Sequence, residues 1–194
     1  MTGVQTCALP ISKILCSDDV LYPHCLEHQI KLFNEYKTSI VFNRRDILLP
    51  SGRKISPQTP SYVKSINAND AFAIYIKSGR NIFGEPVSAL IRTKDLLESE
   101  GFSDLHQYTL DLSGYYEISK NKQVTFDKEI VGFFRVSKAQ WSYKIRHKQN
   151  SAQLYFKREL MKFNYVNVYY FDFILGELKG RLFTLLRSLI YKLG

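Results

Sequence analysis

The pattern of apolar and polar residues along the chain predicts short strands that alternate with helices. An apolar run over 13–16 is typical of the end of a buried strand, and the polar residues 17–19 then predict a turn. The first turn of a helix tolerates proline, so Pro23 opens a predicted helix over 23–36 with three inward-facing residues, Leu26, Ile30 and Phe33. The β-branched stretch 39–45 predicts another strand.

The middle of the chain continues this alternation. Residues 48–61 hold three of the six prolines and predict a loop. The predicted elements that follow are a helix over 70–77, a turn over 84–86, a strand over 87–91, a helix over 93–99, a helix with Asp111 near its start and Tyr115 and Ile118 on its inner face, and two strand pieces within 123–136. We therefore expect an α/β fold with a mixed sheet.

The last third of the chain predicts two helices of different character. Residues 142–163 are basic and polar, whereas residues 176–193 are strongly amphipathic. One face of the second helix carries Leu178, Leu182, Leu185, Leu186, Leu189 and Leu193, and four cations lie off that face: Lys179, Arg181, Arg187 and Lys192. Such a helix either lies in the interface of an anionic membrane or packs against the body of the protein.

Charge is distributed unevenly along the 194 residues. The formal net charge is +9, yet residues 12–137 carry 16 Lys/Arg and 15 Asp/Glu, a balance of +1. Residues 138–194 carry 11 Lys/Arg and 3 Asp/Glu, a balance of +8. This pattern predicts a neutral body with a basic helical C-terminal extension that suits an anionic surface.

Composition argues against a membrane-spanning segment and indicates the cellular compartment. No apolar run is long enough to cross a bilayer, and the three cysteines have no C-x-x-C spacing. A reducing compartment is therefore expected, which predicts a cytoplasmic protein, with a peripheral position at the inner face of the membrane as the alternative that the amphipathic helix raises. Residues 1–11 resemble the translation of a sequencing-library adapter, so we expect them to be non-biological and leave them out of the fold prediction.

Two adjacent carboxylates, Asp18 and Asp19, follow the first predicted strand. Two unpaired negative charges at the end of a buried strand carry a high desolvation free energy, so a cation is expected to bind them. Mg²⁺ or Mn²⁺ binds one or two carboxylates and leaves its other positions to phosphate oxygens and water. The alternative is that the pair only caps the helix that follows.

Four blocks in order resemble the second half of family 2 glycosyltransferases with a GT-A fold. They read LCSDDVLYPHCLEHQIKLF, NIFGEPVSALIRTKDLLESEGF, YTLDLSGYYEIS and VGFFRVSKAQWS. The resemblance runs over residues 13–142 and implies part of a Rossmann-like GT-A domain. It also implies transfer of a sugar from a nucleotide-sugar donor, a UDP-sugar by expectation, to a glycan or lipid-linked acceptor, as in the synthesis of cell-envelope polysaccharides.

The resemblance implies roles for residues that match the blocks. Asp18, with Asp19 after it, matches the D-x-D motif that contacts the metal on the donor diphosphate. Asp111 matches the general base that takes the proton from the acceptor hydroxyl, which implies inversion at the anomeric carbon. The remaining matches lie beside the donor and acceptor and are Gly84, Glu85, Pro86 and Arg135.

The sequence departs from the family pattern at several points. Cys16 stands where the first Asp of the D-x-D triplet is expected, and Ser137 stands where some members carry a histidine. The Q-x-x-R-W signature of processive synthases is missing from the sequence, which favours a single-transfer enzyme. His24 and His28 have a spacing that can bind zinc, but we interpret them as a solvated or half-buried helix face.

The place of the D-x-D-like motif gives a further expectation. The upstream strands that build the nucleotide pocket in the family have no counterpart before Cys16, so we expect a chain truncated at its N-terminus, with weak donor binding and low activity. The predicted organisation is residues 1–11, then the metal and acceptor half over 12–142, then the basic extension over 143–194. The competing hypothesis is a non-enzymatic basic module for nucleic acid or an anionic membrane, although no motif supports nucleic acid as a partner.

Overall fold

A mixed β-sheet forms the centre of the computed structural model, which describes residues 10–56, 63–102, 109–136 and 149–193, with the backbone alone at 149, 150 and 186–193. The strands of the described residues run in the order β1-β6-β3-β7-β2, with β4 paired to β3 and β5 paired to β7. They are β1 (Ile11–Ser12), β2 (Val20–Leu21), β3 (Ile40–Leu48), β4 (Lys54–Ile55), β5 (Lys64–Asn67), β6 (Ala89–Arg92) and β7 (Gln123–Arg135).

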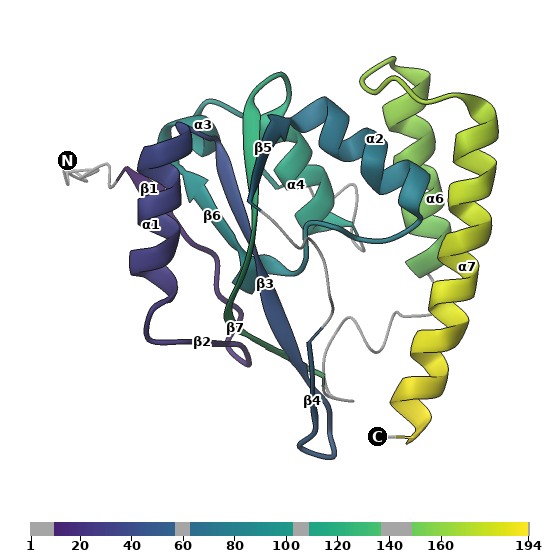
Figure 1. Ribbon diagram of the computed structural model, residues 1–194. Helices are drawn as coiled ribbons and strands as arrows, with labels where there is room; N and C mark the ends of the chain where they lie inside the picture. Colours follow the sequence, from purple (N-terminus) through teal and green to yellow (C-terminus); the bar gives the residue numbers. More distant parts are fainter. Residues whose placement is uncertain (1–9, 57–62, 103–108, 137–148, 194) are drawn as a thin grey trace, which may run out of the picture.

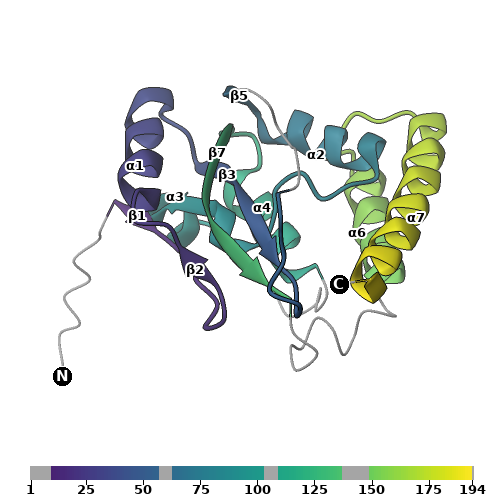
Figure 2. The same ribbon diagram turned by 60° about the horizontal axis from the view of Figure 1, so that its bottom comes forward.

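Helices cover both faces of this sheet (Figures 1 and 2). They are α1 (Cys25–Tyr36), α2 (Ala68–Ser78), the short 3₁₀ helix η1 (Pro86–Ser88), α3 (Thr93–Leu97), α4 (Leu110–Ser119), α6 (Gln149–Lys162) and α7 (Tyr170–Leu193). Successive side chains of a strand point to opposite faces. Accordingly, Val41 packs with α1 residues on one face, while Ile40 and Phe42 join the larger core with α2 and α4 on the other.

The parallel pair β3–β7 is the axis of the sheet. Its register runs from Ile40 opposite Val124 to Leu48 opposite Arg135, with irregularities between Phe42 and Asp46. All other pairings in the described sheet are antiparallel, including β6 with the first half of β3 and β2 with the end of β7. The α/β class with a mixed sheet is therefore confirmed.

The basic extension packs on this domain. Phe156 and Leu160 of α6 and Phe173 of α7 are buried in the main core. In Figure 1, α7 lies beside α6 and α2 at the edge of the molecule farthest from α1. The amphipathic helix predicted over 176–193 is present and begins earlier, at Tyr170.

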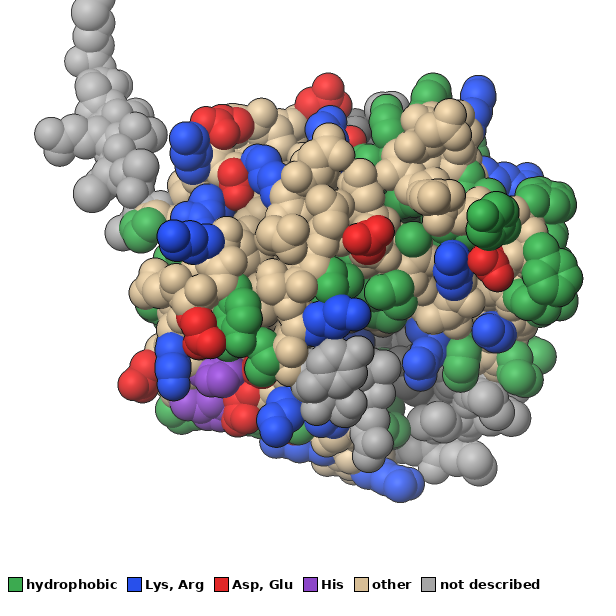
Figure 3. All heavy atoms as spheres, turned by 45° about the horizontal axis from the view of Figure 1, so that its top comes forward, with side chains coloured by type: hydrophobic (Ala, Val, Ile, Leu, Met, Phe, Trp, Pro, Cys, Tyr) green, Lys and Arg blue, Asp and Glu red, His purple; other side chains and the backbone are tan. Residues whose placement is uncertain are grey.

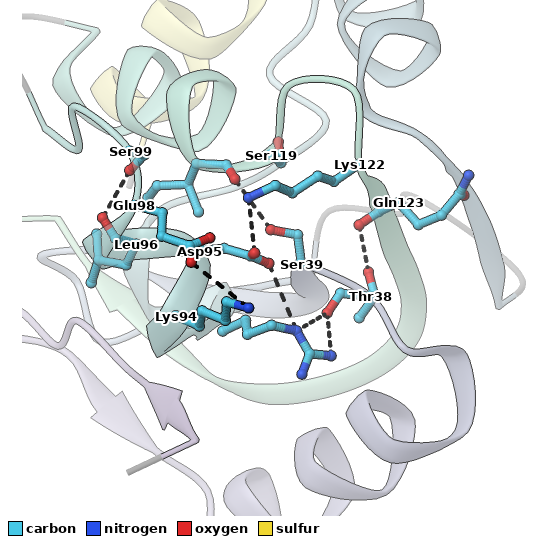
Figure 4. A network of polar contacts seen from close by, with 12 residues as sticks. Thr38, Ser39, Lys94, Asp95, Leu96, Glu98, Ser99, Ser119, Lys122 and Gln123 are labelled. Atoms are coloured by element: carbon cyan, nitrogen blue, oxygen red, sulfur yellow. Dashed lines mark hydrogen bonds and ion pairs between the residues drawn. The ribbon is translucent and has the colours of Figure 1, made fainter. Parts of the chain in front are cut away.

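A polar network fixes the amino ends of the central strands (Figure 4). Asp95 of α3 accepts a 2.8 Å hydrogen bond from Lys122 Nζ and lies 3.7 Å from Arg92 Nε. The Arg92 guanidinium donates to the carbonyl of Thr38, whose hydroxyl in turn donates to the carbonyl of Gln123. The network therefore ties the start of β3 to α3 and to the start of β7.

Two sequence predictions near the N-terminus are wrong. The strand lies at 11–12 rather than 13–16, because Ile11 and Ser12 pair with β6 whereas Ile14 and Leu15 are exposed. The inner face of α1 is also rotated from the prediction: Leu26 and Ile30 are exposed, and the buried residues are Cys25, Gln29, Leu32 and Phe33. The physical reason is that the side-chain amide of Gln29 is buried, where its Nε2 donates hydrogen bonds to Oδ1 of Asn43 and to the carbonyl of Ser88.

Other elements agree with the pattern more closely. The strand predicted over 39–45 and the helix predicted over 70–77 are confirmed as β3 and α2, and the helix of Asp111 is confirmed as α4. Tyr115 and Ile118 are buried, as predicted. The two strand pieces expected within 123–136 are one continuous strand, β7. The predicted loop forms a hairpin through β4, and its residues 57–62 lie outside the described structure.

Candidate functional site

The two adjacent aspartates lie beside the carboxyl end of β7. The turn over Ser17–Asp18 leads into β2, whose Val20 pairs with Phe133 of β7. The backbone N–H of Arg135 donates to Oδ1 of Asp19 over 3.3 Å, and Nε of Arg135 donates to the carbonyl of Asp18 over 3.2 Å. The structure therefore brings Arg135 to the two aspartates, from which it is separated by more than a hundred positions in the sequence.

Asp19 is the buried member of the pair. Its Oδ2 atom has no hydrogen-bond partner among the described residues. The pKa of Asp19 is raised to about 6, chiefly by burial; the negative charges of Asp18 and Glu85 contribute to this rise, while the Arg135 N–H opposes it. A carboxylate with one unpartnered, buried oxygen is costly as an anion, so this position favours either a proton or a cation.

Glu85 and Arg45 form an ion pair next to the aspartates. Nε of Arg45 donates to Oε2 of Glu85 across the gap between β3 and η1. Gly84, before Glu85, has a φ of +80°, and a Cβ there would lie 2.7 Å from Oγ of Ser88. The glycine thus permits both the left-handed backbone and the close approach, while Pro86 begins η1.

Asp111 occupies the first turn of α4. Its Oδ1 accepts a 2.9 Å hydrogen bond from the N–H of Leu112. Burial raises the pKa of Asp111 to about 7; the charge of Glu85 adds to the rise, while the Leu112 N–H and the Arg45 guanidinium lower it. Asp111 as a residue keeps part of its surface exposed, whereas its carboxyl is enclosed closely enough for burial to dominate its pKa.

These groups share one electrostatic environment. The charge of Glu85 acts on both Asp19 and Asp111. Burial raises the pKa of Cys16, and the charges of Asp19, Asp18 and Asp111 raise it further. The sequence-predicted residues Asp18, Asp19, Glu85, Arg135 and Asp111 therefore come from four segments to one edge of the sheet, whereas Ser137 lies outside the described residues.

Sequence reasoning missed Arg45. It lies in β3 next to Arg44, in a strand whose first half is fully buried. Two successive arginines in a largely buried strand are a signal that carboxylates lie nearby, because a half-buried guanidinium requires a counter-charge. Arg45 pairs with Glu85, and its positive charge also lowers the pKa of Asp111.

The described residues of this site do not form a complete set of protein ligands for a metal ion. Within the described residues, no group of three or more His, Cys, Asp or Glu side chains is arranged to hold a metal ion. Nε2 of His28 lies 2.7 Å from Oδ2 of Asp127, while Nε2 of His24 lies 3.4 Å from Glu129 and 3.1 Å from the carbonyl of Ile130. The two histidines thus have separate partners on β7.

Comparison with known proteins bears on the fold. No family model and no curated protein sequence matches the chain. A structure of S. aureus TarS 1–349 in complex with UDP is similar over 75% of this chain and 41% of that one, with 12% identity and a TM-score of 0.50. A further structure of S. aureus TarS matches over 79% of this chain and 29% of that one, with 13% identity and a TM-score of 0.50.

The fold of this chain resembles that of the matched part of TarS. The chain spans less than half of either TarS chain, so the likeness concerns the architecture of that part alone. The roles assigned to Asp18, Asp19, Asp111, Arg135 and residues 84–86 stay predictions. Their gathering at the carboxyl edge of the parallel pair agrees with where ligands bind in open α/β sheets.

Proposed function

We propose that this protein transfers a sugar from a nucleotide-sugar donor to an acceptor hydroxyl with the help of a divalent metal ion. The observation that carries the proposal is the convergence of Asp19, Glu85 and Asp111 from three segments on one edge of a glycosyltransferase-like fold. Two of these carboxyls have pKa values raised toward neutrality by burial, a property that gathers at catalytic sites.

Asp111 is the proposed general base. A base works best when its pKa lies near the working pH, and burial raises the pKa of this carboxyl to about 7. Its deprotonated form accepts the proton of the acceptor hydroxyl as the hydroxyl oxygen bonds to the anomeric carbon. The bond from that carbon to the donor diphosphate breaks at the same time, so the configuration at the carbon inverts.

Asp18 and Asp19 are the proposed metal ligands. The buried Oδ2 of Asp19, which has no partner among the described residues, fits a cation, and the adjacent carboxyl of Asp18 supplies further negative charge. Mg²⁺ or Mn²⁺ needs only one or two protein carboxylates when phosphate oxygens and water complete its shell. Such an ion neutralises the charge of a leaving diphosphate.

The proposed donor is a nucleotide sugar, and the proposed acceptor carries a free hydroxyl. TarS 1–349 is in complex with UDP, which supports a uridine diphosphate sugar as donor for the related fold of this chain. The charge of Glu85 acts on both Asp19 and Asp111, so we assign contacts with the donor sugar and acceptor to the segment of Gly84, Glu85 and Pro86. A glycan or lipid-linked hydroxyl compound is the proposed acceptor.

Metal-dependent binding of UDP tests the proposal. We expect UDP, titrated into the chain with Mg²⁺ and followed by NMR, to bind weakly, because the chain spans 41% of the TarS chain that holds UDP. Binding should weaken at least about tenfold when Mg²⁺ is removed or when Asp19 is replaced in Asp19→Asn. Asp70→Asn, at an exposed position of α2, is the matched control and should bind as the wild type does.

A second measurement separates binding from chemistry. Asp111→Asn should keep the metal-dependent binding of UDP but lose the release of UDP from UDP-glucose or UDP-N-acetylglucosamine, by roughly 10²-fold or more. An affinity for UDP that changes neither when Mg²⁺ is removed nor in Asp19→Asn would contradict the metal assignment. Equal UDP release by Asp111→Asn and the wild type would contradict the assignment of the base.

A further inference from the structure

The packed face of α7 is made of glycines. Gly176 and Gly180 lie against the end of α2, where a Cβ on Gly176 would run into the carbonyl of Ile76 and a Cβ on Gly180 would lie 3.0 Å from the carbonyl of Gly79. Small residues four positions apart let two helix backbones approach closely. Phe173, one turn before Gly176, is buried on the same side.

The opposite face of α7 is therefore turned away from the protein. Leucines at the spacing 178, 182 and 185 lie on one side of a helix, half a turn from the glycines. They are 58%, 56% and 65% exposed, and Phe171 on the same side is 71% exposed. The first half of the predicted leucine face is thus confirmed as exposed, and the helix packs against the body through its other face. The side chains of Leu186, Leu189 and Leu193 lie outside the described residues.

Aromatic side chains extend this apolar surface at the start of the helix. Tyr169 and Tyr170 are 77% and 71% exposed, directly before Phe171. Figure 3 shows hydrophobic side chains, with lysine and arginine among them, at the edge of the molecule formed by α6 and α7. A continuous exposed apolar surface of this kind is uncommon on a monomer and marks an interaction site.

The charges around the surface identify the chemistry of its partner. Both acidic residues of α7 turn to the body, where Asp172 lies 3.4 Å from Lys77 Nζ and Glu177 accepts a 2.7 Å hydrogen bond from Lys157. Lys179 and Arg181 are exposed on either side of the leucine face and join no ion pair within the described residues. The face that points outward is thus apolar in the middle and positive at its margins.

We propose that this face of α7 lies on an anionic lipid surface. A leucine stripe between cations matches a bilayer interface, where the apolar side chains enter the headgroup boundary and the cations meet anionic headgroups. A second copy of the chain fits less well, because it would bring the same cations of α7 against one another and carries the same net charge of +9. No helix in the described ranges is long and apolar enough to cross a membrane.

Vesicle flotation of the full chain tests this proposal, which does not depend on the proposed sugar transfer. We expect the chain to float with phosphatidylcholine vesicles that contain phosphatidylglycerol and to bind pure phosphatidylcholine vesicles at least about tenfold less. The double variant Leu178→Gln with Leu182→Gln should reduce binding roughly tenfold or more. Glutamine keeps a helix propensity near that of leucine, so circular dichroism should show an unchanged fold.

Two further variants sharpen the experiment. Leu97→Gln is the matched control, because Leu97 of α3 is 70% exposed but lies outside this surface, and we expect no change in binding. Lys179→Gln with Arg181→Gln should weaken binding to anionic vesicles and remove most of its sensitivity to salt. Failure to bind anionic vesicles overturns the proposal, as does a dimer in analytical ultracentrifugation that the leucine variant dissociates.

Discussion

The backbone N–H of Arg135 donates a hydrogen bond to Oδ1 of Asp19 over 3.3 Å. The bond joins the carboxyl end of β7 to the turn before β2. The pairing of β2 with β7 holds this turn in place. It satisfies one oxygen of Asp19 and leaves the buried Oδ2 without a partner in the described structure. The candidate site therefore holds a carboxylate that is fixed through Oδ1, while its buried Oδ2 has no partner among the described residues.

Asp19 should make the stability of the protein sensitive to divalent metal. At pH 7.5 its carboxyl is ionised, because its pKa is about 6, and Mn²⁺ or Mg²⁺ should raise the melting temperature in differential scanning fluorimetry. At pH 5 the carboxyl is protonated, so the same ion should have little effect. Asp19→Asn should lose the metal effect at both pH values, and a shift that persists in this variant would place the metal elsewhere.

Asp111 should lower the stability of the protein as the pH rises. Its folded-state pKa of about 7 lies above the ordinary value of 3.8, so between these values the folded state binds more protons than the unfolded state. The free energy of unfolding therefore falls from about pH 4 to about pH 7 and is level above that.

Asp111→Asn tests this dependence. The variant should gain about 2 kcal/mol relative to the wild type at pH 8 compared with pH 5, a value that allows for the hydration that a partly exposed carboxylate keeps. Urea denaturation at the two pH values measures the difference. A gain that is equal at both pH values would mean that Asp111 titrates near its ordinary pKa.

Several elements could be predicted because their signal is local. The β-branched run of β3 and the asparagine cap of α2 each specify an element within a few residues, and Asn67 does accept from the N–H of Asn69. The same holds for the leucine periodicity of α7. The candidate site residues Asp18, Asp111 and Arg135 were predicted from the order of the four sequence blocks, because that order matches the family in which they belong to one site.

The failures come from polar groups that are buried by distant partners. Lys13 lies inside the predicted strand, yet its ammonium donates to Oε1 of Gln29 over 2.9 Å and to the carbonyl of Val87 over 2.9 Å. Burial lowers the pKa of Lys13 to about 8. Periodicity places Gln29 on the solvent-facing side of the helix, and the predicted inner face of α1 was therefore rotated. The direction of the leucine face of α7 was likewise decided by Gly176, whose contact with α2 no local pattern shows.

Gly176 should be essential for the docking of α7. A glycine in a helix interior costs about 1 kcal/mol relative to alanine, so propensity alone predicts that Gly176→Ala is stabilising. The new Cβ would instead collide with the carbonyl of Ile76, a backbone atom that cannot turn away, and we expect a net loss of about 1–3 kcal/mol in the free energy of unfolding.

Gly180→Ala is the graded comparison for this change. Its Cβ would lie 3.0 Å from the carbonyl of Gly79, a tight but milder contact, so its loss should be smaller than that of Gly176→Ala. Hydrogen exchange of the amides of α7 reports the docking directly and should quicken in Gly176→Ala before the rest of the domain opens. Stabilisation by both alanines would show that α7 does not approach α2 this closely.

Asp127 should be the most important polar residue of the α1 side of the sheet. Its Oδ2 atom accepts hydrogen bonds from Nδ2 of Asn43 over 2.7 Å and from the N–H of Glu129 over 3.0 Å, and it lies 2.7 Å from Nε2 of His28. Asp127→Ala leaves a buried amide without its acceptor and should cost about 2–4 kcal/mol in the free energy of unfolding. His28→Ala removes one half-exposed partner and leaves the Asn43 bond in place, so it should cost only about 1 kcal/mol. Chemical denaturation of both variants checks this order, and an equal loss would show that the histidine, rather than the buried amide, carries the network.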